Sequence, residues 1–476
     1  MPNQHKPLPP EDDIKESFKF YYGLGINDKK IALHMRDHYD TERYGLSVRS
    51  VKRLRDKWEL KSTRQQKHTL ESIGEAIQDI RRQYPSRGAD MIRRDLLVKL
   101  NMRVPRPLIQ RYLHETEPHA VQARKQRRFK RRRFYAAGVN DVWAQDQHDK
   151  WGPRFGLWLH NNIDPFIGFN NWLKVWWTNK NPRLITRYFL NTVREFGAIP
   201  VTTQSDPGSE NYGVANVQTV IRQTLDPSLK GTLQHRWMRK KNNVKSEANW
   251  SVFRRDFAPG YEDLFESGVV AGYYDVDNPL ENLVFRWLAI PWIQSELDKW
   301  VLVRNRTAPR ADTKKVLPHG IPELMRVKPE LYDAMDFKIP VPLNLIDELE
   351  QVYAPPDHPV FQLTPPEFHE HASAFYARMG SPVVTFDTFW NVYRQMLQSF
   401  QVEVANANPE QPLTSIVSLH FNRMEQIENE PLPLLPGMKD YRMGGIEQNG
   451  EGADAEEMYA SFTEESSESD VPDLEE

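Results

Sequence analysis

The sequence contains no cysteine among its 476 residues. Disulfide bonds, zinc fingers built on cysteine ligands and a cysteine nucleophile are therefore excluded. No apolar run approaches the roughly 20 residues that a helix needs to span a bilayer. The N-terminal segment MPNQHKPLPPEDD is polar and proline-rich, and it lacks the apolar centre of a signal peptide. We expect no membrane association, and a location in the nucleus or otherwise in the cytoplasm.

A P-loop is also missing, so ATP hydrolysis is not indicated. The formal net charge is only −2, but this value averages two segments of opposite sign. Residues 124–133 read RKQRRFKRRR, whereas the tail 451–476 carries many Asp and Glu residues and no Lys or Arg. Like charge at such density cannot be buried and must face solvent or phosphate. The local charge blocks therefore say more about binding than the average does.

We expect the basic segment to form a linker at 121–138 that holds DNA, with a nuclear-import signal as an open alternative. The side chains expected to contact DNA there are Arg124, Lys125, Arg127, Arg128, Lys130, Arg131, Arg132 and Arg133. The acidic end at 441–476 is rich in Gly, Ser and Glu and is expected to be disordered. This tail could recruit unidentified protein partners, shield the basic segment in the free protein, or do neither.

After a disordered leader at 1–13, residues 14–66 read as a helix-turn-helix unit. Asn27 or Asp28 can cap a first helix, and Ser47 can cap a second one, VRSVKRLRDKW. The second helix combines an apolar stripe with basic residues that fall mostly off it, which is typical of a DNA-reading helix. The basic residues are Arg49, Lys52, Arg53 and Arg55. An ordinary helix with a solvated basic face remains the alternative.

Residues 67–120 predict a second helical unit, either three-helix or winged-helix. From 139 to 310 the pattern changes to an α/β domain. Three strand-like runs, VWAQDQHDKW, LWLHNNIDPF and FNNWLKVWWTN, suggest an antiparallel meander. A helix, the strand IPVTTQSD and further helices follow, which is the order of a ribonuclease-H-like core with a mixed five-stranded sheet and flanking helices. Residues 311–440 have no assigned role.

Three carboxylates lie at suggestive places in this core. Asp146 lies in the first strand, Asp206 at the end of the fourth, and Glu247 early in the helix KNNVKSEANW. Phosphoryl transfer on DNA needs two divalent ions, one to activate the attacking hydroxyl and one to stabilise the leaving oxygen. Mg²⁺ and Mn²⁺ prefer oxygen ligands. We therefore predict that these three residues are catalytic and hold Mg²⁺ or Mn²⁺, as two ions.

The motifs around these acids resemble the integrase catalytic core of DDE transposases and retroelements. The chain looks closest to the integrase-core-domain proteins of fungal and animal genomes. The matching elements are W-x-x-D at 143–146, W-T-N-x-N-P at 177–182, D-x-G-x-E-N at 206–211 and N-x-x-x-E at 243–247. The resemblance implies an integrase-like catalytic core at 139–310. It also implies supporting roles for Trp143, Glu210, Asn211 and Asn243.

The motif around the third acid departs from the family pattern N-x-R-I-E-R, because this chain reads Asn-Val-Lys-Ser-Glu-Ala at 243–248. Lys245 keeps one positive charge and is expected to contact DNA. The preceding basic residues Arg239, Lys240 and Lys241 are expected to bind phosphates, with an exposed flexible loop as the alternative. An intact triad favours an active transposase or integrase that works on DNA as a homo-oligomer. The altered surroundings of Glu247 favour a domesticated DNA-binding protein that has lost activity.

Overall fold

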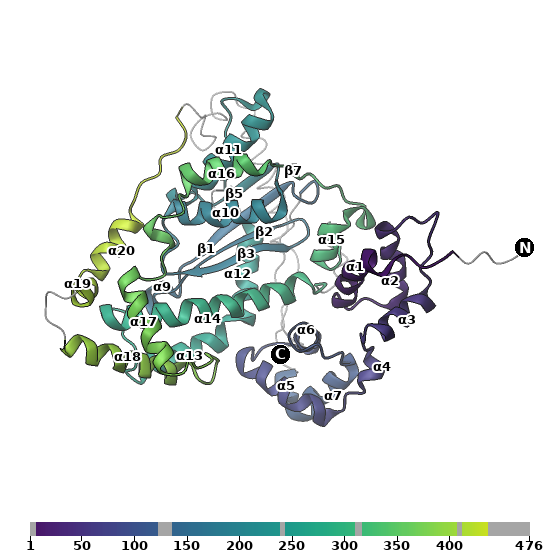
Figure 1. Ribbon diagram of the computed structural model, residues 1–476, viewed down its shortest axis with the longest axis horizontal. Coiled ribbons are helices and arrows are strands. Elements are labelled where there is room, and N and C mark those ends of the chain that lie inside the picture. Colours follow the sequence, from purple (N-terminus) through teal and green to yellow (C-terminus); the bar gives the residue numbers. More distant parts are fainter. Residues whose placement is uncertain (1–5, 122–135, 239–242, 310–316, 407–411, 437–476) are drawn as a thin grey trace, which may run out of the picture. The chain divides into compact units, whose positions relative to one another are not determined.

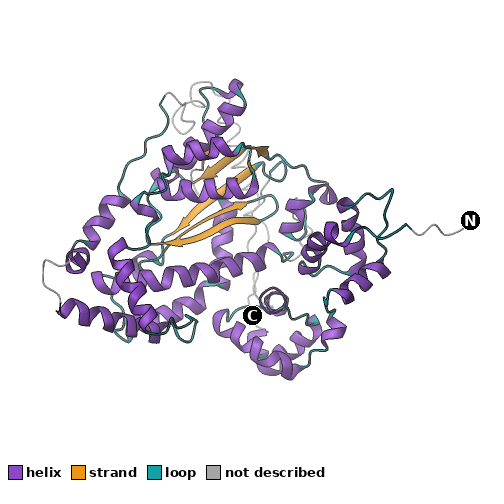
Figure 2. Cartoon of the chain, in the orientation of Figure 1, coloured by secondary structure: helices purple, strands orange, loops and turns teal. Residues whose placement is uncertain are grey.

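The computed structural model describes residues 6–121, 136–238, 243–309, 317–406 and 412–436. The chain divides into two compact units, Met1–Arg128 and Phe129–Glu476. Figure 1 traces the elements of both units, and Figure 2 shows that strands occur only in the second. Within the described residues, no helix has the length and apolarity that crossing a membrane would require.

The first unit consists of helices. Its elements are α1 (Glu11–Gly23), α2 (Asp28–His34), η1 (Met35–His38), α3 (Val48–Lys57), α4 (Thr63–Gln66), α5 (Leu70–Gln83), α6 (Ala89–Leu100) and α7 (Arg106–Thr116). Two caps follow the sequence prediction, because Asn27 accepts from the Lys30 backbone and Ser47 from the Ser50 backbone. Each satisfies a backbone donor that the first turn of a helix leaves open.

The segment predicted as three-helix or winged-helix is the three-helix form. It contains α5, α6 and α7, and residues 6–121 include no strand that could make a wing. Ile73, Ile77 and Ile80 form the buried stripe of α5. Arg87 and Asp95 form a fully buried ion pair between the turn after α5 and α6. A pair of this kind stabilises the packing only while both partners remain, because either alone would be an uncompensated buried charge.

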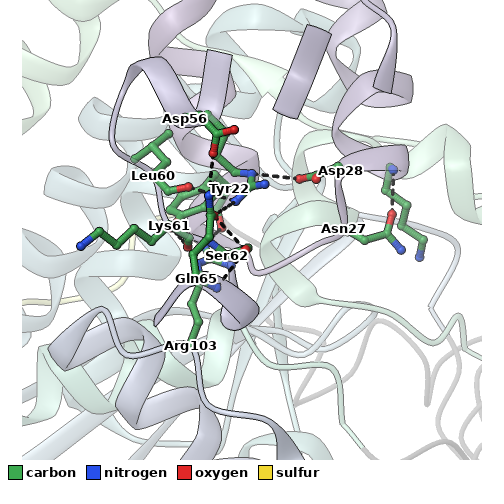
Figure 3. A network of polar contacts seen from close by, with 11 residues as sticks. Tyr22, Asn27, Asp28, Asp56, Leu60, Lys61, Ser62, Gln65 and Arg103 are labelled. Carbon is green, nitrogen blue, oxygen red and sulfur yellow. Dashed lines mark hydrogen bonds and ion pairs between the residues drawn. The ribbon is translucent and has the colours of Figure 1, made fainter. Parts of the chain in front are cut away.

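Arg103 ties the two helical groups of this unit together (Figure 3). Its guanidinium lies 3.5 Å from the centre of the Tyr22 ring and donates to the Tyr22 carbonyl at 2.6 Å. The Tyr22 hydroxyl in turn donates to the Lys61 carbonyl at 2.7 Å. Residues 14–66 and 67–120 therefore share one compact unit, although the sequence pattern suggested two.

The core of the second unit is a five-stranded sheet in the order β3-β2-β1-β5-β6. Its strands are β1 (Val142–His148), β2 (Trp158–Asp164), β3 (Phe169–Trp176), β5 (Thr202–Ser205) and β6 (His235–Trp237). The first three form the predicted antiparallel meander, while β5 runs parallel to β1 and β6 parallel to β5. The mixed five-stranded sheet is thus confirmed and agrees with a ribonuclease-H-like fold.

Helices cover both faces of this sheet (Figure 1). On one face lie α10 (Pro182–Phe196), α11 (Tyr212–Leu225) and α16 (Leu343–Tyr353), whose apolar side chains share a core with Trp143 and Trp172. On the other, α12 (Val244–Asp256) contacts β1 and β2. The long helix α14 (Pro279–Asn305) contacts β3, and α13 (Ala258–Val270) follows α12.

Two side-chain amides of α14 close the free edge of the sheet along β3. Gln294 accepts from the Val175 backbone at 3.0 Å and donates to the Leu173 carbonyl at 3.1 Å. Asn305 pairs with both backbone groups of Asn170 in the same way, at 2.9 and 3.0 Å. An edge strand satisfied by side chains offers no template for pairing with another strand.

The described part of 311–440 packs onto the core and does not form a separate unit. Its elements are α15 (Pro322–Val327), η4 (Pro329–Tyr332), β7 (Ile339–Pro340), α16, η5 (Pro359–Phe361), α17 (Pro366–Arg378), α18 (Phe389–Asn406), α19 (Pro412–Ser418) and α20 (His420–Glu428). β7 pairs with β4 (Ala198–Ile199) in a second small sheet. Beyond α20, the chain lies along α11, where Asn216 bonds the Pro433 carbonyl at 2.9 Å and the Leu435 amide at 3.0 Å.

Candidate active site

Strand register places Asp146 and Asp206 next to each other. Strands β1 and β5 are parallel neighbours, and their last paired positions are Ala144 and Gln204. Two residues further along each chain are Asp146 and Asp206. Adjacent strands are about 4.8 Å apart, so the two carboxylates emerge side by side at the same edge of the sheet.

The alternation of side chains along β1 directs Asp146 toward α12. Successive strand residues face opposite sides, so Asp146 shares a face with His148. The His148 ring stacks on Trp250 of α12, with 5.0 Å between ring centres. Glu247 precedes Trp250 by three residues on the same helix, which is close to one turn. The fold thus brings all three predicted carboxylates to one region.

The charges of the three acids act on one another, as expected for carboxylates that lie close together. Burial raises the pKa of Asp146 to about 8, and the charges of Asp206 and Glu247 raise it further. Burial also raises the pKa of Asp206, with contributions from Glu247 and Glu210. Carboxyl groups that are buried beside one another resist ionisation because each charge repels the next. A nearby cation would reverse this effect.

The hydrogen bonds of Asp146 and Asp206 leave room for a cation. Asp146 accepts only from the adjacent Gln147 amide, at 3.0 Å, and the buried Oδ1 of Asp206 has no partner among the described residues. Oxygen-rich, donor-poor surroundings of this kind fit Mg²⁺ or Mn²⁺. In the described part of the chain, however, no three acidic or His side chains are already gathered tightly enough to hold a metal ion. The fit of this site to a metal ion therefore rests on the carboxylate oxygens that it offers and on their negative charge, which no cation balances among the described residues.

A buried amide network fixes the elements that carry these acids. Asn243, at the start of α12, donates to the Gln145 carbonyl at 2.8 Å and accepts from Gln204 at 3.4 Å. Gln145 donates to Asn211 at 2.7 Å, and Asn211 donates to Glu210 at 2.7 Å. The network links β1, β5, the loop after β5 and the first turn of α12. Three of the four predicted supporting residues belong to it.

Sequence reasoning missed Gln145 and Gln204, which join this network from the middle of two strands. Both are buried, at 0 % and 3 % exposure. The signal was present, because a polar residue between apolar ones in an interior strand must find buried partners. The fourth supporting residue, Trp143, packs against Phe189 of α10 and donates to Asn140 at 2.9 Å, so it supports the start of β1.

The W-T-N motif steadies the far end of β1. Asn179 donates to the Asp149 carboxylate at 2.7 Å and to the Leu159 carbonyl at 3.2 Å. Asn181 caps α10, accepting from the Arg183 amide at 2.9 Å. Both residues have structural roles. Asn179 also affects the site, because it binds Asp149, whose charge contributes to the raised pKa of Asp146.

The predicted DNA-contacting residues are distributed unevenly. Arg49, Lys52 and Arg53 are exposed on α3. Arg55 is a correction, because its side chain is only 6 % exposed and is occupied within the unit. It pairs with Asp28 at 3.3 Å and donates to the Leu60 carbonyl at 3.1 Å and to Gln65 at 3.0 Å. The packing of α2 against α3 turned this residue inward.

The remaining basic residues divide by location. Lys245 lies partly buried in the first turn of α12. The predicted linker side chains Arg124, Lys125, Arg127, Arg128, Lys130, Arg131, Arg132 and Arg133 lie outside the described residues, as do Arg239, Lys240 and Lys241. The acidic tail at 441–476 also lies outside them.

Part of this chain is similar to a known protein family. Residues 134–321 match the integrase core domain family. The matched segment contains the whole five-stranded sheet, the three carboxylates and helices α10 to α14. No curated protein matches the chain.

Proposed function

Residues 134–321 of this chain are an integrase core domain, and on that premise we propose that the protein binds DNA and cleaves and joins its strands. This is a transposase- or integrase-type phosphoryl transfer that depends on divalent metal. Asp146, Asp206 and Glu247 are the proposed metal-holding residues, and Mg²⁺ or Mn²⁺ the proposed ions. The domain itself belongs to a class of polynucleotidyl transferases.

One observation carries this proposal. Asp146 near the end of β1 and Asp206 just after β5 are partly buried carboxylates with raised pKa values, and the Oδ1 of Asp206 has no hydrogen-bond partner among the described residues. Glu247 lies on α12, which contacts β1. A merely structural cluster of acids would be expected to gain Arg or Lys partners. None of the three triad carboxylates forms an ion pair among the residues described.

The chain's own residues would act mainly by positioning. Asp146 and Asp206 would supply oxygen ligands from the sheet edge, and Glu247 from α12. Bound ions would activate the attacking hydroxyl and stabilise the leaving oxygen. Asp146 must first lose its proton, because its pKa of about 8 leaves it largely protonated at neutral pH without metal. Asn243 would hold α12 against β1 so that Glu247 keeps its place.

DNA binding is proposed for two further parts of the chain. The exposed basic residues Arg49, Lys52 and Arg53 of α3 form a cationic helix surface. The density of positive charge at 124–133 suits non-specific attraction to phosphates. We also propose assembly of more than one copy on DNA, because joining two ends takes more than one active site, and a nuclear location.

The test is a strand-cleavage and strand-transfer assay with Mg²⁺ or Mn²⁺. Glu247→Gln and Asp206→Asn should each abolish the metal-dependent product. A matched control is Asp298→Asn, which changes a solvent-exposed carboxylate on α14. Wild-type activity in Glu247→Gln would refute the catalytic role of the triad.

A second candidate function is DNA binding without catalysis. It is favoured by the sequence Val-Lys-Ser-Glu-Ala at 244–248, which lacks the arginines of the family pattern, and by the absence of a preformed metal-binding set in the described residues. This candidate predicts DNA binding by wild type and by Glu247→Gln alike, with no metal-dependent product from either.

A further inference from the structure

Arg286 is a buried cation on α14 that the catalytic proposal does not use. Its side chain is only 5 % exposed. It lies 4.1 Å from the centre of the Trp177 ring and donates to the Gln362 carbonyl at 3.0 Å, while its Nε has no hydrogen-bond partner among the residues that the structure describes. An arginine keeps its charge in proteins, so a full positive charge is enclosed here.

The neighbourhood of Arg286 does not neutralise this charge. Burial lowers the pKa of Arg286 well below its ordinary value, and Arg423 of α20 lowers it further. Glu428 acts in the opposite direction, but its carboxylate is paired with Lys180 at 3.3 Å. No ion pair joins Arg286 to a carboxylate within the described ranges. Enclosing an unpaired charge is costly unless an anion accompanies it.

A small cavity lies beside this charge. It has a volume of about 20 Å³ and is lined by Arg286, Arg423, His420 and Thr364, among others. Thr364 is only 3 % exposed, and within the described parts of the chain its hydroxyl has no hydrogen-bond partner. A water-sized occupant needs roughly 10–15 Å³ by this kind of measure. The cavity thus has room for one monatomic ion. Its wall carries positive charge and a hydroxyl group.

His420 belongs to the same wall but adds no charge of its own. Burial lowers its pKa to about 3, with further lowering by Arg286 and Arg423, so its ring is neutral at physiological pH. One ring nitrogen, Nε2, is hydrogen-bonded to the Asn282 side chain at 3.0 Å. The positive potential of the cavity therefore comes from the two arginines.

We propose that this cavity binds a monatomic anion of the chloride class, held by Arg286, Arg423 and the Thr364 hydroxyl. The anion would complete the contact between three parts of the second unit: α14, the segment 359–365 and α20. It would act as a structural ligand that fastens the C-terminal helices to the core. The small volume favours a monatomic ion over a tetrahedral phosphate or sulfate.

Thermal unfolding of the full chain tests this directly. Melting temperatures are compared in chloride, bromide and gluconate salts of sodium at equal ionic strength. The halides should raise the melting temperature by about 2–4 °C over gluconate, as a ligand that binds only the folded state does. Arg423→Gln and Thr364→Val should each remove most of this difference. Arg286→Met should remove it completely.

Arg378→Gln is the matched control, because Arg378 is exposed on α17 and lies outside the cavity wall. It should keep the wild-type response to halide. Crystals grown in bromide should show one anomalous peak between Arg286 and Thr364. The proposal is overturned if Arg423→Gln and Thr364→Val respond to halide as wild type does, or if bromide is absent from the cavity.

Discussion

A pH titration of the metal-free protein probes the carboxylate site at its most unusual group. The Asp146 carboxyl would ordinarily lose its proton at pH 3.8, but burial and the neighbouring acids raise its pKa to about 8. Between these two values the folded protein holds a proton that the unfolded chain releases. The free energy of unfolding therefore falls as the pH rises through this window. The contribution of the Asp146 proton to stability is fully present only below about pH 4.

The size of the effect follows from the two pKa values. Each step of one pH unit between them lowers the free energy of unfolding by about 1.4 kcal/mol. From pH 4 to pH 7 the sum has an upper bound of about 4 kcal/mol. Asp146→Asn keeps the shape of the side chain and removes the titration. We expect this variant to match wild type near pH 4 and to be markedly more stable at pH 7–8.

Urea unfolding in EDTA, followed by tryptophan fluorescence, measures this difference. Every tryptophan except Trp58 lies in the second unit, so the signal reports on the unit that contains Asp146. Adding Mg²⁺ at pH 7 should stabilise wild type, since a cation favours the ionised carboxylate, and should have little effect on Asp146→Asn. Asp298→Asn serves as the control. The reasoning fails if Asp146→Asn follows the wild-type pH curve and keeps the wild-type response to Mg²⁺.

Four further predictions concern positioning and DNA binding. Asn243→Ala removes the bonds that hold α12 to β1, and should lower the free energy of unfolding by about 1–3 kcal/mol in denaturant titrations; an unchanged stability would contradict the network. Replacing both Lys52 and Arg53 by Gln should weaken DNA binding and reduce the slope of log affinity against log salt by up to about two, without a change in melting temperature. Arg55→Gln should instead lower the melting temperature of the first unit, because it breaks a buried contact with Asp28; a purely DNA-binding defect would show that Arg55 faces outward. Neutralising four basic residues in 124–133 should flatten the salt slope by about one for each lost phosphate contact, and an unchanged slope would leave that segment as an import signal.

The strand and helix order of the core could be predicted because each element carries its own local pattern. Short apolar alternations predicted β1 to β3, and apolar periodicity predicted α10. The strand β6 was missed, since three residues give too short a pattern, although His235 and Trp237 are buried around exposed Arg236. The C-terminal helices were mostly missed because frequent prolines obscured their periodicity.

The candidate site was predicted only in part, because local motifs identify single residues but not their distant partners. The motifs indicated Asp146, Asp206 and Glu247, and parallel pairing of β1 with β5 brought the first two together. The role of Gln145 was not predicted, because a buried amide can be recognised only once its partners are known. Arg55 was predicted to contact DNA but is buried against Asp28. An apolar stripe shows which face of a helix packs within its unit, but not which charged residue lies opposite that face.

The sequence by itself determined the order of the core elements from β1 to β5 and the caps of two N-terminal helices, and it indicated the three acids as candidates. These depend on side-chain periodicity and backbone hydrogen bonding over a few residues, which local sequence encodes. Only the tertiary structure decided which acids become neighbours, which amides hold α12 in place, and that Arg55 and Arg286 are enclosed. Those outcomes depend on contacts between residues far apart in the chain, where burial and the charges of distant neighbours, not local pattern, set each side chain's energy.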